Sequence, residues 1–284
     1  MANNTTIRTQ ALVIGAGATG AGVMRDLALR GVHCVLVDRS DVNAGASGGN
    51  HGLLHSGGRY VSNDPHAATE CREEGDILKK LSPQCIEETS GYFVAVEGDD
   101  EKFIADYKGH CDACGIDCRE IDPAEAREQE PNLAENTIAV YEVPDASVDP
   151  FKLSLENIAH AKMHNGSKYL RRTEVVGFDI SGGRINAALC RDVDTGEETR
   201  VEAEQYINAA GAWADGIARL AGAEIAMMFS QGTLLVTQER LSRRVINRLR
   251  PPSDGDILVP GGTVSILGTT SVKIDDPAKC RPTV

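Results

Sequence analysis

Three glycines near the start of the chain have the types and spacing of a dinucleotide-binding turn. Gly15, Gly17 and Gly20 follow the apolar run Ala11-Leu-Val-Ile14, and a helix is expected to begin near Ala18. In such a turn the first glycine allows a tight bend, the second lets the backbone approach a pyrophosphate, and the third lets the helix pack closely on the strand. The pyrophosphate is then bound by the exposed amides of the helix N-terminus.

An acidic residue completes this motif. Asp38 ends the next apolar run, which begins at His33. A carboxylate at this place accepts hydrogen bonds from both ribose hydroxyls and repels a 2′-phosphate, so the nucleotide is NAD or FAD rather than NADP. Because glycine-rich turns also occur with nothing bound, the prediction rests on the agreement of strand, helix, acidic residue and spacing.

A second segment carries side chains that a plain NAD-binding fold does not need. It is Gly45-Ala-Ser-Gly-Gly-Asn-His-Gly-Leu-Leu-His-Ser-Gly-Gly-Arg-Tyr60. Its histidines, His51 and His55, offer an imidazole with a pKa suited to a general base. Arg59 offers a planar cation that matches phosphate oxygens, and Tyr60 adds a hydroxyl. Structurally, the histidines could instead hold the loop by hydrogen bonds, and Arg59 could pair with one of the 42 acidic residues.

Composition limits the class of protein. The 284 residues suffice for two domains, and a hydrophobic content of 41% is ordinary for a soluble globular protein. A formal charge of −13 argues against nucleic-acid binding, which needs a basic surface. The first ten residues are polar, and no apolar run reaches about eighteen residues. We therefore expect a cytoplasmic protein with no transmembrane segment and with any membrane contact peripheral.

The eight cysteines have irregular spacing, which indicates reduced thiols rather than a disulfide framework. Cys111, Cys114 and Cys118 form a CxxCxxxC run that could suggest a metal or iron–sulfur site. However, a helix over residues 100–115 followed by a strand over 116–121 would carry Cys118 away from the other two, and no fourth ligand is near. We expect structural thiols and no metal, with a metal site as the alternative.

The elements that must position these residues alternate along the chain. Asp-Pro pairs at 64–65, 122–123 and 149–150 are typical of helix starts, with the aspartate as N-cap, and the helices are expected to run to about Leu81, to before Pro131 and to about His164. A strand is expected over 91–97, and residues 174–204 predict a three-stranded antiparallel meander. Residues 205–213 then return to the parallel sheet and lead into a helix to Leu220. Further strands are expected near 233–237, 256–259 and 264–270.

Five segments together resemble the FAD-dependent oxidoreductases of the D-amino-acid-oxidase-like superfamily, and within it the glycerol-3-phosphate dehydrogenases, most closely their anaerobic members. They are the Gly15–Gly20 turn, Asn50-His-Gly-Leu-Leu-His-Ser-Gly-Gly-Arg-Tyr60, Val143-Pro-Asp-Ala-Ser-Val-Asp-Pro-Phe151, Ile207-Asn-Ala-Ala-Gly-Ala-Trp213 and Leu267-Gly-Thr-Thr270. The resemblance covers nearly the whole chain. It implies an α/β fold with a discontinuous Rossmann-type FAD-binding domain, residues 1–90 and 145–226, and an interleaved antiparallel-sheet substrate domain, residues 91–144 and 227–284.

The resemblance also implies the cofactor and its contacts. FAD is wrapped by the segment after Gly45, Val175 lies against the adenine, and Ala210-Gly211 passes under the pyrophosphate; Val175 could equally be core in any meander. The full set of expected FAD contacts is Gly15, Gly17, Ala18, Thr19, Gly20, Asp38, Arg39, Ala46, Ser47, Asn50, Leu53, Val175, Ala210 and Gly211.

The implied reaction is oxidation of sn-glycerol 3-phosphate to dihydroxyacetone phosphate, with electrons passed to a membrane-associated partner and to quinone. His55 is the expected base at the flavin, with His51 as its alternative, and Arg59 and Tyr60 are expected to bind the phosphate. Two rival predictions remain. One is a superfamily oxidoreductase acting on a 2-hydroxy acid or an amine, and the other is a catalytically silent FAD-binding subunit or fragment.

The sequence departs from the family pattern in two ways. Gln231 precedes Gly232 where a lysine is common. Family members also continue well beyond the residues that correspond to Val284, so we expect a C-terminally truncated chain whose own activity is in doubt.

Five arginines crowd a stretch expected to be helical. They are Arg240, Arg243, Arg244, Arg248 and Arg250, and their spacing covers more than one helix face. This favours a solvated helix, with a docking surface for a partner subunit or anionic lipid as the alternative.

Overall fold

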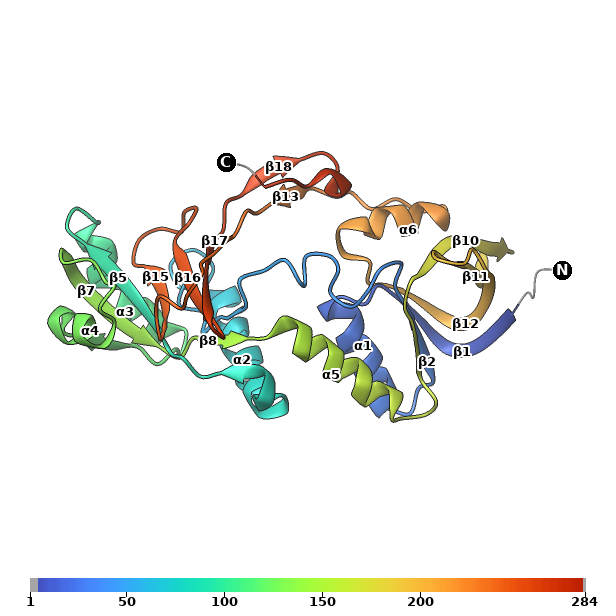
Figure 1. Cartoon of the computed structure of the whole chain (residues 1–284), viewed down its shortest axis with the longest axis horizontal. Coiled ribbons are helices and arrows are strands. Elements are labelled where there is room, and N and C mark those ends of the chain that lie inside the picture. Colours follow the sequence, from blue (N-terminus) through green and yellow to red (C-terminus); the bar gives the residue numbers. More distant parts are fainter. Residues whose placement is uncertain (1–4, 283–284) are drawn as a thin grey trace. The chain divides into compact units, whose positions relative to one another are not determined.

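The computed structural model describes residues 5–282, and the chain divides into two compact units (Figure 1). The first unit comprises Met1–Gly49, Pro150–Phe229 and Ile274–Cys280, and the second comprises Asn50–Asp149, Ser230–Lys273 and Arg281–Val284. Residues 50–90, expected beside the cofactor, thus belong to the second unit. There β3 (Leu53–Leu54) and β4 (Ile86–Glu87) both pair with β8 (Ala146–Val148). The assignment of cofactor and substrate domains stays a prediction.

The first unit is built on a six-stranded sheet with the order β10-β11-β12-β1-β2-β9. Its strands are β1 (Thr5–Ile14), β2 (Cys34–Val37), β9 (Lys168–Leu170), β10 (Thr173–Ser181), β11 (Arg184–Asp192) and β12 (Glu198–Asn208). The last four in this order, β12 to β9, are mutually parallel, whereas β10, β11 and β12 form the predicted antiparallel meander. One long strand, β12, therefore serves both the meander and the predicted return to the parallel sheet.

Helices cover both faces of this sheet. On one face α1 (Ala18–Leu29) packs against α5 (Pro150–Lys162), and Val13, Met24 and Ile158 share one buried cluster there (Figure 1). The other face buries Leu12 and Val201 beside α6 (Ala214–Leu220), which follows a short 3-10 turn over Gly211–Trp213. These layers confirm the predicted α/β class with a Rossmann-type sheet.

The second unit contains a seven-stranded, mostly antiparallel sheet. In spatial order its strands are β14 (Leu235–Val236), β17 (Val264–Gly268), β16 (Ile257–Gly261), β15 (Val245–Arg248), β5 (Gly91–Val96), β7 (Thr137–Val143) and β6 (Arg119–Ile121). Phe93, Tyr107 and Tyr141 lie in the core between this sheet and α3 (Glu101–Ala113). The second unit also contains α2 (Pro65–Leu81), α4 (Pro123–Gln129) and a 3-10 turn over Pro83–Cys85. The strands β13 (Phe229–Gln231) and β18 (Val272–Ile274) form a separate two-stranded sheet, and a 3-10 turn over Pro277–Lys279 belongs to the first unit.

The Asp-Pro pairs start helices as predicted. Asp64 accepts a hydrogen bond from the amide of Ala67 at 3.0 Å, and Asp122 accepts one from Ala124 at 2.8 Å, with proline at the first helical position in both cases. The three helices end within two residues of the expected positions, at Leu81, Gln129 and Lys162.

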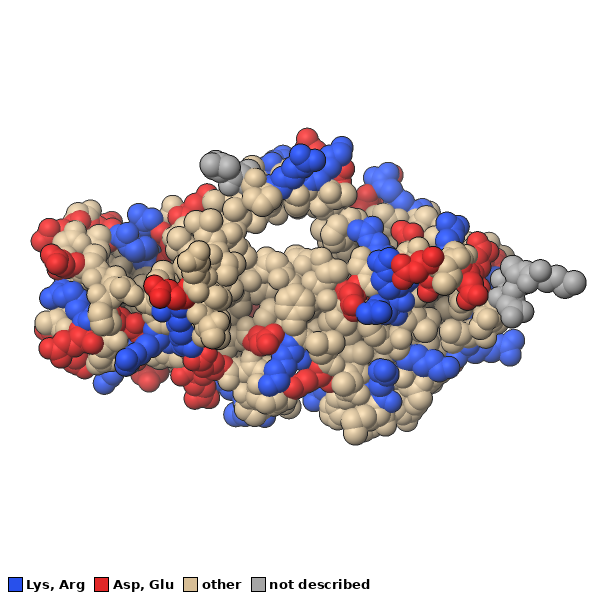
Figure 2. Space-filling view, viewed as in Figure 1, with Lys and Arg blue, Asp and Glu red and all other residues tan. Residues whose placement is uncertain are grey.

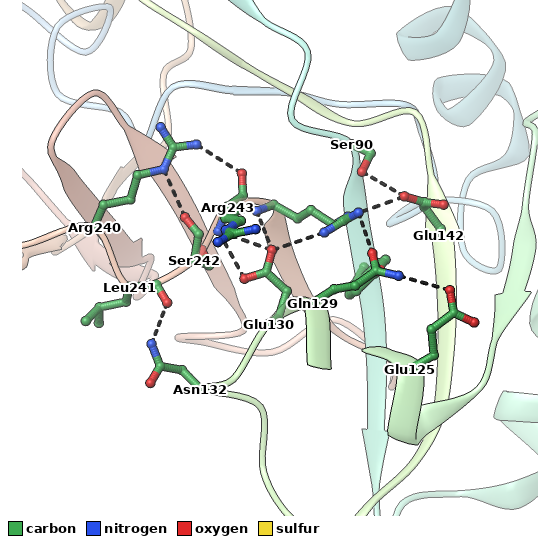
Figure 3. A network of polar contacts seen from close by, with 12 residues as sticks. Ser90, Glu125, Gln129, Glu130, Asn132, Glu142, Arg240, Leu241, Ser242 and Arg243 are labelled. Atoms are coloured by element: carbon green, nitrogen blue, oxygen red, sulfur yellow. Dashed lines mark hydrogen bonds and ion pairs between the residues drawn. The ribbon is translucent and has the colours of Figure 1, made fainter. Parts of the chain in front are cut away.

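The arginine-rich stretch is not a helix, and that prediction was wrong. Residues 240–250 contain the strand β15, and four of the five arginines form ion pairs with carboxylates of the same unit, whereas Arg243 is exposed. The ion pairs are Arg240 with Glu87, Arg244 with Glu130 and Glu142, Arg248 with Asp99, and Arg250 with Asp256. Figure 3 shows the network around Glu130, whose carboxylate accepts the backbone amides of Arg243 and Arg244. Elsewhere, charges of both signs are interspersed on the face drawn in Figure 2.

The expected separation of Cys118 from the other cysteines was also wrong. The strand begins only at Arg119, and Cys111, Cys114 and Cys118 lie in one buried cluster. A hydrogen bond between the thiols raises the pKa of Cys111 and lowers that of Cys118. Within residues 5–282, no group of three or more histidine, cysteine or acidic side chains is arranged to hold a metal ion. Likewise, no helix of these residues is long and apolar enough to cross a membrane.

Candidate nucleotide and catalytic sites

The glycines of the first turn have steric reasons to be glycine. Gly15 has a φ of +109°, which side chains rarely adopt, and a Cβ there would collide with the carbonyl oxygen of Ala209. A Cβ at Gly20 would collide with the carbonyl oxygen of Gly15, because helix α1 packs directly on the turn. At Gly17 a Cβ would lie 2.9 Å from the Ser47 hydroxyl.

The N-terminus of α1 is open toward this turn. Its N-cap, Gly17, has no side chain to cap the helix. Instead the amide of Ala18 donates to the Ser47 hydroxyl at 3.0 Å, so the second segment reaches the helix N-terminus. Free amides and the helix dipole at such an end favour an anion.

Asp38 is fixed at the same turn. One carboxylate oxygen accepts the amide of Ala16 at 2.7 Å, and the other accepts the amide of Ser40 at 2.7 Å. Since a carboxylate offers about four acceptor sites, ribose hydroxyls can still donate to it. These two bonds hold the group in place before any ligand arrives.

A pocket of about 470 Å³ opens at this turn, lined by residues of the first unit. Among the expected FAD contacts, those lining it are Gly15, Gly17, Thr19, Asp38, Arg39, Ala46, Ser47, Val175, Ala210 and Gly211. Ala18 and Gly20 support the turn without lining the pocket, and Asn50 and Leu53 belong to the second unit. The volume lies within the range of about 300–1,000 Å³ that is usual for ligand pockets.

Trp213 is a pocket residue that the sequence reasoning did not assign. The Arg39 guanidinium lies over its ring, 4.4 Å from the centroid, and Gly45 passes close enough that a Cβ would lie 3.3 Å from the ring. The stacked pair forms a planar wall of the pocket. Trp213 stands in the quoted Ile207–Trp213 segment, so the residue was visible in the sequence, whereas its stacking on Arg39 was not.

The expected catalytic residues lie together in the second unit. The ring centroids of His51 and His55 are 6.1 Å apart, and those of His55 and Tyr60 are 5.4 Å apart. His51 also accepts the amide of Leu53 through Nδ1 at 3.2 Å, which is the loop-holding role considered as its alternative. No such bond is recorded for the His55 ring among the described residues.

Burial controls the charge of both histidines. It lowers the pKa of His51 to about 4, and repulsion by His55 and Arg59 acts in the same direction. It also lowers the pKa of His55, while the Asp145 carboxylate opposes this shift. Both rings are therefore neutral near pH 7 and can accept a proton, and the opposing effect of Asp145 favours His55 as the base.

Arg59 has no carboxylate partner among residues 5–282, in contrast to Arg240, Arg244, Arg248 and Arg250. Its guanidinium donates to the carbonyl oxygen of Ser253 at 3.2 Å and is otherwise open to a further acceptor. The structural alternative, pairing with an acidic residue, is not realised.

Asp145 is a second residue that the sequence reasoning missed. It is 3% exposed and accepts the amide of Ser56 at 2.7 Å and the Asn247 side-chain amide at 3.0 Å. It lies within the quoted Val143–Phe151 segment, but a single aspartate after a proline carries no sign of being buried. Its partners come from segments about 90 and 100 residues away, a distance at which single-sequence reasoning has no signal.

Comparison with known proteins decides the family. Residues 10–284 match the FAD dependent oxidoreductase family. The chain belongs to this family. The predicted family and its cofactor, FAD, are thereby confirmed.

Curated relatives are similar over nearly all of the chain. A subunit of the anaerobic glycerol-3-phosphate dehydrogenase of Escherichia coli K12 is 45% identical over 93% of this chain and 48% of the relative. The corresponding protein of Haemophilus influenzae is 41% identical over 94% of this chain and 47% of the relative. The chain thus spans about half the length of these relatives.

Solved structures agree on the fold. The glycerol-3-phosphate dehydrogenase of Bacillus halodurans complexed with FAD superposes with a TM-score of 0.72 at 23% identity, over 97% of this chain and 50% of that one. The L-proline dehydrogenase of P. horikoshii superposes with a TM-score of 0.79 at 22% identity, over 97% and 73%.

The residues present fit the nucleotide half of FAD. Side chains at Gly15, Gly17 or Gly20 would fill the space beside the turn. The uncapped N-terminus of α1 suits a pyrophosphate, and the Asp38 carboxylate, held by the amide of Ala16, suits a ribose. All three features meet at one pocket of the first unit.

Proposed function

We propose that this chain contributes the FAD-binding and substrate-oxidising machinery of a glycerol-3-phosphate dehydrogenase, which converts sn-glycerol 3-phosphate to dihydroxyacetone phosphate. The observation that carries the proposal is Arg59, a guanidinium without a carboxylate partner among the described residues, close in sequence to two neutral histidines. Such an arginine suits a phosphate, and a neutral imidazole suits the removal of a hydroxyl proton. The names and 41–45% identity of the curated relatives support the same substrate.

In this proposal the second segment binds and deprotonates the substrate. Arg59 binds the phosphate, and Tyr60 donates its hydroxyl, which stays protonated because burial raises its pKa. His55 accepts the proton of the substrate's secondary hydroxyl, with His51 as the alternative base. FAD, when bound, supplies the acceptor for the two electrons that leave the substrate carbon.

The cofactor contacts are proposed as follows. The amide of Thr19 at the start of α1 faces the pyrophosphate across the glycine turn, Ala18 supports this turn through Ser47, and Ala210 and Gly211 lie beneath the pyrophosphate. Asp38 accepts the ribose hydroxyls, Val175 contacts the adenine, and Arg39 closes the pocket. Ala46 and Ser47 line the same pocket of the first unit, and Asn50 and Leu53 of the second unit are proposed as further FAD contacts.

Electron transfer out of the protein is part of the proposal as well. Each of the two curated relatives is named as one subunit of its enzyme, which implies further subunits. We place the acceptor in such a partner, associated with the inner face of the cell membrane and passing electrons to quinone.

The test uses Arg59. In FAD-loaded protein, Arg59→Ala should lower the apparent second-order rate of flavin reduction by glycerol 3-phosphate at least about tenfold, because a charge-assisted hydrogen bond contributes about 1.5–3 kcal/mol. Arg59→Lys should recover only part of this, since an ammonium lacks the planar fork. Arg243→Ala is the matched control, because Arg243 is another arginine of the second unit whose side chain is exposed and has no carboxylate partner among residues 5–282.

Substrate comparison separates a phosphate contact from damage to the loop. Unphosphorylated glycerol should be a poor substrate for wild type and Arg59→Ala alike. Equal losses for glycerol and glycerol 3-phosphate would contradict the phosphate role. Faster flavin reduction by a 2-hydroxy acid or an amine than by glycerol 3-phosphate would replace the proposed substrate.

The base is tested separately. His55→Ala should slow flavin reduction by about a hundredfold to ten-thousandfold with little change in substrate affinity, as expected for loss of a general base. Rapid mixing measures both quantities. A normal rate of flavin reduction in His55→Ala would mean that His51 or another group, and not His55, is the base.

A further inference from the structure

Asp145 is a buried carboxylate without a cationic partner. It is 3% exposed, and among residues 5–282 no lysine, arginine or histidine nitrogen forms an ion pair with it. The contrast is with Asp256, also 3% exposed, whose charge is balanced by Arg250. An unpaired buried charge is costly for a fold, so its surroundings indicate what it does.

His55 directly follows strand β3, and Asp145 directly precedes strand β8. Strands β3 and β8 pair antiparallel, with Leu53 opposite Ser147 and Leu54 opposite Ala146. Continued by one residue beyond the last paired residues, this register would set His55 opposite Asp145. Residues directly opposite in an antiparallel pair lie on the same face, with Cβ atoms about 4.5–5.5 Å apart.

Hydrogen bonds fix the carboxylate in that position. The amide of Ser56, next to His55 in the chain, donates to one oxygen at 2.7 Å, and Nδ2 of Asn247 donates to the other at 3.0 Å. On its far side the carboxylate packs on Gly91, where a Cβ would lie 2.6 Å from it. Neither oxygen can turn away from the histidine loop without losing a bond.

We propose that Asp145 is a positioning residue for His55: held by Ser56 and Asn247, its negative charge stabilises the imidazolium that forms when His55 accepts the substrate proton. The interaction acts through charge across the β3–β8 pair and not through a direct ion pair. This role rests on the proposed function of His55 as the base, but the charge effect itself can be measured without substrate.

The other groups facing His55 do not replace Asp145. From its own segment they are His51, Arg59 and the Tyr60 ring, and the arginine disfavours a protonated His55. From α2, Cys71 faces Tyr60 and Asp145. Of the charged groups that act on His55, Asp145 favours the protonated ring, which agrees with its upward effect on the pKa of that histidine.

The decisive variant is Asp145→Asn. It has the same shape, and its amide oxygen can still accept from Ser56. The new amide nitrogen of residue 145 would face Nδ2 of Asn247, and two donors cannot bond. The Asn247 side-chain oxygen is buried with no hydrogen-bond partner, so the Asn247 side chain can flip and accept from the new amide nitrogen. The matched control is Asp256→Asn, which removes another buried carboxylate of the same unit.

The measurement is the pKa of His55 by NMR titration of the full chain without FAD, with its signal among the seven histidines assigned through His55→Asn. Asp145→Asn should lower this pKa, because the group that favours the imidazolium is lost, while Asp256→Asn should leave it unchanged. An unchanged His55 pKa in a folded Asp145→Asn protein overturns the proposal.

A wild-type measurement covers the case in which Asp145→Asn fails to fold. The carboxyl carbon of Asp145 should show a titration step at the pKa of His55 that is absent in His55→Asn, and the absence of this step in wild type overturns the proposal as well. With FAD and glycerol 3-phosphate, folded Asp145→Asn should reduce flavin about ten- to a hundredfold more slowly near neutral pH. Failure of wild type to oxidise that substrate would refute the proposed function while leaving the NMR result standing.

Discussion

The buried ring of His51 should make the folded state sensitive to mild acid. Its pKa is about 4 in the folded chain against an ordinary value of 6.5, because burial and nearby positive charge disfavour the imidazolium. Between these values the unfolded chain binds the proton and the folded chain does not. The free energy of unfolding therefore contains a contribution that is fully present above pH 6.5 and is lost as the pH falls toward 4.

The magnitude follows from the two pKa values. Taken in full, they imply a loss of about 1.8 kcal/mol between pH 7 and pH 5. Because the ring is only partly buried, solvent screening reduces this, and we expect about 1–1.5 kcal/mol. The variant His51→Asn removes the titration while keeping an acceptor where Nδ1 now accepts the amide of Leu53.

The assay is urea unfolding followed by circular dichroism at pH 7 and pH 5, without FAD. Wild type should lose about 1–1.5 kcal/mol more than His51→Asn on acidification. His66→Asn controls for replacing a histidine as such, because the His66 side chain is exposed on α2. The same pH dependence in wild type and His51→Asn would show that the folded ring is protonated as easily as the unfolded one, and the reasoning about its burial would fail.

Three further predictions concern groups outside the histidine cluster. Asp38→Ala should weaken FAD binding about ten- to a hundredfold by calorimetry while the circular dichroism spectrum is kept; an unchanged dissociation constant would remove Asp38 from the site. Gly20→Ala should destabilise the first unit by about 1–3 kcal/mol and weaken FAD binding, whereas Gly22→Ala, with open space in the same helix, should stabilise it by about 0.5–1 kcal/mol; equal effects would refute the close-packing argument. Glu130→Gln should cost about 1–3 kcal/mol in urea unfolding, because a single oxygen replaces the two that accept the Arg243 and Arg244 amides, and the exposed Glu128→Gln should cost little.

Local chemistry made much of the fold predictable. The Asp-Pro pairs act within one helical turn, and the spacing of the glycine turn lies within six residues, so both can be recognised in the sequence, although Ala209 also restricts Gly15. The meander and the parallel return were predictable for the same reason, since alternation within each strand reports its exposed and buried faces. The sequence did not predict that a single strand, β12, belongs to both the meander and the parallel sheet. This strand pairs with β11 on one side and with β1 on the other.

The helix predicted for the arginine-rich stretch was wrong because contacts with distant segments, and not local sequence, determine its structure. Arginine is a good helix former, and nothing inside residues 240–250 contradicts a helix. What decides against it is a set of carboxylates from other segments, Glu87, Asp99 and Glu130, that hold the arginines along an extended backbone. Tertiary ion pairs override a weak local propensity, and a single sequence cannot show them.

The same limit separates a candidate ligand-binding arginine from a structural one. Arg59 and Arg248 are alike in the sequence, each beside apolar or aromatic neighbours and each in a chain rich in acid. In the folded chain Asp99 lies 2.7 Å from Arg248, whereas no described carboxylate pairs with Arg59. Asp145 is the converse case, a carboxylate that no described arginine neutralises and that accepts the amide of Ser56, the residue after a histidine. Within the described residues, neither Arg59 nor Asp145 has an ion-pair partner. In the proposed reaction the substrate phosphate would balance the charge of Arg59, and the protonated His55 ring would balance the charge of Asp145.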